Sequence, residues 1–279
     1  MSWLEARFDL SSPVFWLFIS TAIAILATNV AWLVAHLSAQ RPPSTGLRWL
    51  RSDAVRAAAW LLASLWLLVL PFYAWRYAAI SPALLGIAEI DWAESLGIGG
   101  LFAGLIIALT VFGWLVYRHI LPACADADVR DSRLLLALAA AAEAGLLQWH
   151  LAFYRAALIA WLSASEALPG SLPTALLHAA QSQSFYWGSW LGLALILAEA
   201  GLNPFVRDAL ATPSVAEIRR GRPEALLRTL ALLIATTALF LLTRNFWLSL
   251  ACHIVVNTAI AGWLPLHRPA RPAPPYQPC

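Results

Sequence analysis

The sequence contains little charge. Only 12% of its 279 residues are charged and 61% are hydrophobic, and the mean hydropathy is +0.71. Soluble globular domains contain about a quarter charged residues, so this composition excludes the ordinary soluble class. It predicts an integral membrane protein.

Cysteine is scarce and lysine is absent. The three cysteines, at Cys124, Cys252 and Cys279, are too few and too scattered for a disulfide framework or a zinc finger. Arginine supplies all 18 basic residues, and the arginines collect in alternate loops, so the net charge of +3 reflects membrane orientation. We therefore predict no nucleic-acid partner. The predicted partners are membrane lipid and a membrane protein or peptide substrate.

Apolar runs of about 20 residues, the length that crosses a bilayer, recur along the chain. The fold predicted from them is an all-α polytopic membrane helix bundle of about seven transmembrane helices, within a range of six to eight. Only Thr243, Arg244 and Asn245 separate the last two runs, which predicts a tight antiparallel hairpin. The predicted spans are 14–37, 57–75, 96–117, 134–162, 185–202, 225–242 and 246–266.

The arginine-rich loops predict the orientation, because cytoplasmic loops are enriched in basic residues. They place the N-terminus outside and the C-terminus inside, and the predicted location is a bacterial plasma membrane. The chain divides into N-terminal transmembrane helices (1–133, about three), a transmembrane core (134–266) and a proline-rich cytoplasmic tail (267–279).

Two pairs of glycines have the spacing that lets membrane helices approach closely. They are Gly100 with Gly104 and Gly188 with Gly192. We expect both pairs to form packing surfaces.

The fourth predicted span contains polar residues at membrane depth. Helical spacing places Glu143, His150 and Tyr154 on one stripe, and Gln148 and Arg155 on a second. An ionisable group inside a bilayer costs about 2.5–3.5 kcal/mol on insertion scales and is by default a functional candidate. The alternative for Glu143 is a neutral carboxyl that is hydrogen-bonded to a neighbouring helix.

His253 and Asn257 are four residues apart in the last span and share one helical face. They are candidates for an internal polar site, and the alternative is a hydrogen bond that bridges two helices. Glu199, near the end of the fifth span, is expected to reach headgroups or Arg207.

Metal binding requires several ligands in a fixed geometry. The spacing of Glu143, His150 and His253 does not show such a geometry. No cofactor is certain from the sequence, and a divalent metal stays an alternative that the ligand spacing does not support.

The segment LTRNFWLSLACHIVVN resembles the last conserved segment of the CPBP family, the CAAX-protease and bacteriocin-processing (Abi) intramembrane proteases. The family pattern has Glu-Glu-xxx-Arg, Phe-xxx-His and His-xxx-Asn or His-xxx-Asp on successive spans. His253 and Asn257 match the third motif, and Glu143 takes the first glutamate position. Ala144 and Gln148 stand at the second glutamate and the arginine, and no phenylalanine precedes a histidine by four positions. The resemblance covers roughly residues 134–266.

This resemblance implies an intramembrane endopeptidase, of a kind described as glutamic or as metalloprotease. Glu143 would activate water, and His253 and Asn257 would orient the water or stabilise the oxyanion. His150 would replace the missing carboxylate as a base. The alternative is a catalytically inactive relative that acts as a membrane scaffold or binds a partner. A third class, a small transporter or cofactor-binding subunit, is suggested by the depth of Glu143 and His150.

Overall fold

The computed structural model describes residues 12–40, 66–76, 80–120, 133–164, 183–211 and 222–260. The regular structure of these residues is entirely helical, which confirms the predicted all-α class. Residues 66–76 form a helix, and the other helices are α1 (Pro13–Gln40), α3 (Pro82–Leu85), α4 (Trp92–Ile120), α5 (Arg133–Ala164), α7 (Ser184–Leu202), α8 (Pro204–Ala211), α10 (Arg222–Thr243) and α11 (Phe246–Thr258).

Five helices are long and apolar enough to cross a membrane, namely α1, α4, α5, α7 and α10. They correspond to five of the seven predicted spans. The predicted span 57–75 is described only from residue 66 onward, and the end of the predicted span 246–266 also lies outside the described residues. Within that last span, α11 has 13 residues. At 1.5 Å per residue it is about 20 Å long, which is shorter than the hydrocarbon core of about 30 Å.

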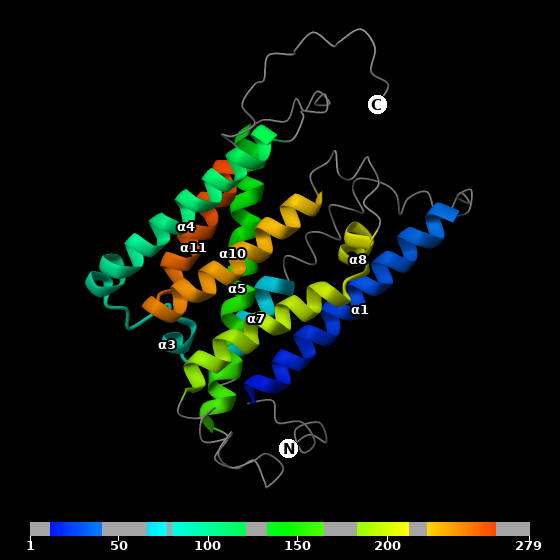
Figure 1. Ribbon diagram of the computed structural model, residues 1–279. Coiled ribbons are helices and arrows are strands. Elements are labelled where there is room, and N and C mark those ends of the chain that lie inside the picture. Colours follow the sequence, from blue (N-terminus) through cyan, green and yellow to red (C-terminus); the bar gives the residue numbers. More distant parts are fainter. Residues whose placement is uncertain are drawn as a thin grey trace, which may run out of the picture.

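Helix α5 runs through the middle of the bundle. In Figure 1, α4 and α11 lie on one side of it, α1 and α8 lie on the other, and α10 crosses it. Helix α7 packs against α5 in the antiparallel direction, since Ser163 Oγ donates to Ser184 Oγ (3.0 Å) at one end and Tyr154 contacts Glu199 toward the other. α5 therefore faces neighbouring helices on several sides.

Glycines bring α5 and α7 together. A Cβ atom at Gly192 would lie 2.9 Å from the backbone N and Cα of Arg155, and one at Gly188 would lie 2.7 Å from the backbone N of Ile159. Larger residues would force the two backbones apart. The predicted packing role of this glycine pair is confirmed.

The second glycine pair behaves differently. A Cβ atom at Gly100 or Gly104 would meet no atom within 4 Å among the described residues, and the neighbouring Leu101 is 80% exposed. The prediction that this pair packs against a helix was wrong for the described part of the chain. Glycine spacing creates a smooth helix face, but the arrangement of the other helices decides whether a neighbour covers it.

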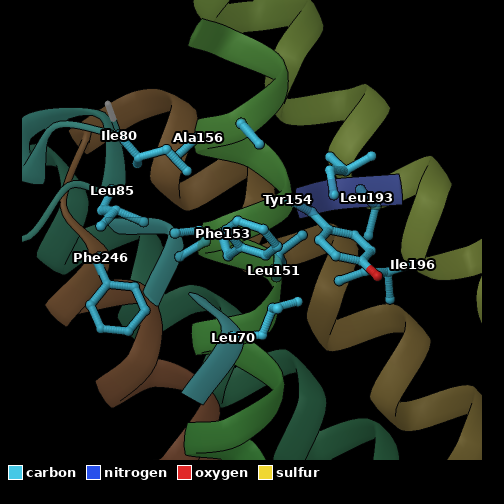
Figure 2. Close-up of a cluster of buried hydrophobic side chains, with 14 of the residues drawn as sticks. Leu70, Ile80, Leu85, Leu151, Phe153, Tyr154, Ala156, Leu193, Ile196 and Phe246 are labelled. Atoms are coloured by element: carbon cyan, nitrogen blue, oxygen red, sulfur yellow. The ribbon is translucent and has the colours of Figure 1, made fainter. Parts of the chain in front are cut away.

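Apolar side chains of α5 fill the centre of the bundle. Leu151 and Phe153 are fully buried, and Figure 2 shows them among Leu85 of α3, Leu193 of α7 and Phe246 of α11. Many large apolar side chains elsewhere on the long helices are exposed, as expected of surfaces that face lipid. The membrane assignment made from composition is supported by this arrangement.

Two residues join α10 to α11, as the tight-hairpin prediction requires. Arg244 adopts a positive φ of 50°, and the Asn245 side chain accepts a hydrogen bond from Leu248 N (3.1 Å) and so caps α11. Phe246 N donates to the carbonyl of Gly86 (2.9 Å), which ties the hairpin to the end of α3. A Cβ atom at Gly86 would collide with the Phe240 ring and the Arg244 carbonyl.

Candidate functional site

Helix α5 carries buried polar residues on two faces. Gln148 contacts α10 and α11 on one face, whereas His150 and Tyr154 contact α7 on the other, and Tyr154 also reaches α1. All three side chains are at most 3% exposed. One member of each predicted stripe thus enters a separate polar cluster: Gln148 the first, and His150, together with Tyr154 of its stripe, the second. Glu143 and Arg155, the remaining members, belong to neither cluster.

The first cluster, called the α5–α10–α11 centre below, is built on Gln148, Thr236 and His253, and it includes Asn257, which lies one turn from His253 on the same face of α11. Gln148 Nε2 lies 2.8 Å from Thr236 Oγ1 and 2.8 Å from His253 Nδ1. Thr236 Oγ1 already donates to the Leu232 carbonyl (2.7 Å), so it accepts from Gln148, and this orients the amide. The second N–H of Gln148 then donates to His253 Nδ1. The ring proton of His253 is consequently on Nε2.

Three buried atoms of this centre have no hydrogen-bond partner among the described residues. They are Gln148 Oε1, His253 Nε2 and Asn257 Oδ1. His253 is fully buried and Asn257 is 6% exposed. A buried polar atom without a partner costs about 1–3 kcal/mol, so a ligand or water that satisfies these two acceptors and one donor would be stabilised here.

The second cluster lies between α1, α5 and α7. Tyr154 Oη donates to Glu199 Oε2 (3.0 Å), and Thr21 Oγ1 donates to Tyr154 Oη (3.1 Å). His150 Nε2 is 3.6 Å from Glu199 Oε2, and the His150 ring lies against the Tyr154 ring with centroids 4.2 Å apart. Figure 2 shows the hydroxyl end of Tyr154 directed toward Ile196 of α7. A partly exposed carboxylate thus meets a buried imidazole and a buried phenol.

The structure separates the predicted site residues. His253 and Asn257 lie together in the α5–α10–α11 centre, and His150 belongs to the second cluster. Glu143 is exposed, and no hydrogen bond or ion pair joins it to any of these three residues within the described part of the chain.

The position of Glu143 follows from the length of α7. α7 runs antiparallel to α5 and reaches the level of His150 with Glu199, three residues before its end at Leu202. Glu143 is seven residues, or about 10 Å, further toward the start of α5. Its side chain therefore has nearly the same direction as His150 but lies beyond the helix that covers His150.

The residue next to Glu143 points inward. Ala144 is fully buried and lies one turn from Gln148, on the face that turns toward α11. A longer side chain at this position would be directed toward the His253 face.

The sequence did not reveal the role of Glu199. We expected it to reach headgroups or Arg207, whereas its carboxylate turns inward to Tyr154 and His150. The only signal in the sequence was its position on α7, one turn after Leu195 on the same face of the helix. The choice between lipid and protein depends on helix packing, so spacing alone did not decide it.

A metal site is not formed by the described residues, because no group of three or more His, Cys, Asp or Glu side chains there could hold a metal ion. No known protein family, curated protein or solved structure matches the chain.

Proposed function

We propose that this chain is a divergent CPBP-like integral membrane protein that binds a partner segment within the membrane and does not cleave it. The observation that carries the proposal is the set of unpaired atoms in the α5–α10–α11 centre. An unwound peptide segment offers the matching N–H and C=O groups.

The absence of a carboxylate partner argues for binding over hydrolysis. In the described part of the chain no Asp or Glu is hydrogen-bonded or ion-paired to Gln148, His253 or Asn257. Activation of water by a general base requires that base within hydrogen-bond reach of the water. Glu143 lies outside this centre, and Ala144 provides no carboxyl group in its place.

The test combines cross-linking with an assay for proteolysis. A benzoylphenylalanine at Ile254, a partly exposed position next to His253 on α11, would report a segment that reaches the edge of the His253 face. We expect a discrete photoadduct that is lost in His253→Leu and Asn257→Ala variants and retained in the matched control Glu143→Ala. Transmembrane peptides in nanodiscs should remain uncleaved.

Two results would overturn the proposal. One is peptide cleavage that disappears in the Glu143→Ala variant, which would restore the endopeptidase role implied for Glu143. The other is an adduct that persists unchanged when His253 and Asn257 are both substituted in a folded variant. Helical content by circular dichroism shows that each variant is folded.

A second candidate function is an endopeptidase that uses Glu199. The observation that favours it is the 3.6 Å separation of His150 Nε2 and Glu199 Oε2, since a carboxylate and an imidazole at this distance can share the proton of an activated water. Cleavage that is abolished by Glu199→Gln and unaffected by Glu143→Gln would support this candidate. Cleavage that persists in Glu199→Gln would exclude it.

A further inference from the structure

Arg155 is a buried cation that neither polar cluster uses. It is fully buried, and its Nε, Nη1 and Nη2 atoms have no hydrogen-bond partner in the part of the chain that the structure describes. In the described residues no carboxylate forms an ion pair with it. Arg155 lies nine residues, or about 14 Å, inside the end of α5, so its charge lies at membrane depth.

The only described partner of the guanidinium is an aromatic ring. Arg155 Cζ lies 3.2 Å from the centroid of the Phe240 ring of α10. Phe240 in turn stacks on Phe185 (centroids 5.4 Å apart, interplanar angle 22°), and Arg244 Cζ lies 4.6 Å from the Phe185 centroid. A stack of two arginines and two phenylalanines thus leads from the exposed Arg244 to the buried Arg155.

A cation–π contact satisfies only part of what a buried guanidinium requires. The ring attracts the positive charge through the flat face of the group, whereas the five N–H donors point outward in its plane. Burial removes the hydrogen bonds that these donors would make with water, and the described residues provide no acceptor in their place. Ionisable groups in this situation inside membrane proteins mark ligand sites.

We propose that Arg155 is the anchor of an internal anion site that binds a carboxylate. Phe240 covers one face of the guanidinium, so an anion must approach the edge that carries the N–H groups. The fork of donors at that edge matches the two oxygens of a carboxylate in a bidentate pair. The carboxylate comes either from a fatty acid in the bilayer or from a small aqueous acid.

The test uses the full chain in nanodiscs and two probes, acetate and oleate, each labelled with ¹³C at the carboxyl carbon. Binding is measured from exchange broadening of the carboxyl NMR signal. Wild-type protein should bind at least one probe, and Arg155→Gln should weaken that binding at least about tenfold, as expected for the loss of charge-assisted hydrogen bonds. Binding of oleate alone identifies a lipid source, and binding of acetate as well identifies an aqueous source.

Arg244→Gln is the matched control. It removes an arginine that makes the same kind of contact with a phenylalanine but is exposed, and it should leave the affinity within about twofold, as is usual for surface charges. Arg155→Lys keeps the charge without the fork and should also bind more weakly. The proposal is overturned if wild-type protein broadens neither signal, or if Arg155→Gln or Arg155→Lys binds as tightly as wild type.

Discussion

The hydrogen bond between Gln148 and His253 holds the α5–α10–α11 centre together, and a double-mutant cycle measures its contribution. Replacement of His253 by leucine removes the acceptor of one Gln148 N–H. Replacement of Gln148 by leucine removes the amide that donates to both His253 Nδ1 and Thr236 Oγ1, each 2.8 Å from Gln148 Nε2. Each single variant leaves buried polar atoms without partners, and we expect each to lower the free energy of unfolding by about 1–3 kcal/mol.

The double variant leaves fewer buried atoms unpaired than the two single variants leave together. Its loss of stability should fall short of that sum by about 0.6–1.7 kcal/mol, the range measured for hydrogen bonds between membrane helices. The assay is reversible unfolding in mixed micelles of increasing dodecyl sulfate fraction, followed by far-UV circular dichroism.

The control pair combines His253→Leu with Ser163→Ala. Ser163 is hydrogen-bonded to Ser184 at the far end of α5, 15 residues or about 22 Å from Gln148. This pair should be additive within about 0.3–0.5 kcal/mol. If the Gln148 and His253 substitutions are equally additive, the two side chains do not interact and the proposed centre is refuted.

Three further predictions concern the helix packing. Gly192→Val should lower the free energy of unfolding by about 1–3 kcal/mol because its side chain meets backbone atoms, whereas Gly104→Val should be nearly neutral; equal losses in micelle unfolding would contradict the difference. Tyr154→Phe should cost about 1 kcal/mol in the same assay by removing the hydroxyl that donates to Glu199, and a neutral result would show that this bond is not formed. Asn245→Ala should cost about 0.5–2 kcal/mol by uncapping α11. Amide hydrogen exchange should become faster at the start of α11 and stay slow in α5, and unchanged exchange at the start of α11 would refute the cap.

The helices could be predicted from composition and hydropathy because a bilayer demands long apolar segments. Five predicted spans appear as helices of sufficient length, and the connection through Arg244 and Asn245 is as tight as expected. The position of His253 and Asn257 on one face of α11 also followed from spacing, since residues four apart on a helix lie on the same side.

The contacts between helices could not be predicted from spacing. Glu143 and His150 share a stripe of α5, yet α7 covers only His150, because α7 ends before it reaches the level of Glu143. In the same way, Gly192 packs against the backbone of Arg155, whereas no described atom lies next to Gly104, although both glycines belong to pairs with the same spacing.

The sequence by itself determined that this is a helical membrane protein and which residues share a face of each helix, because both depend on local periodicity and on the apolar bilayer. Only the tertiary structure decided that Gln148 joins His253, that Glu199 turns to His150 and that Arg155 lies buried against Phe240. Those contacts depend on where each helix ends and how it crosses its neighbours, and neither property is encoded in the spacing along a single helix.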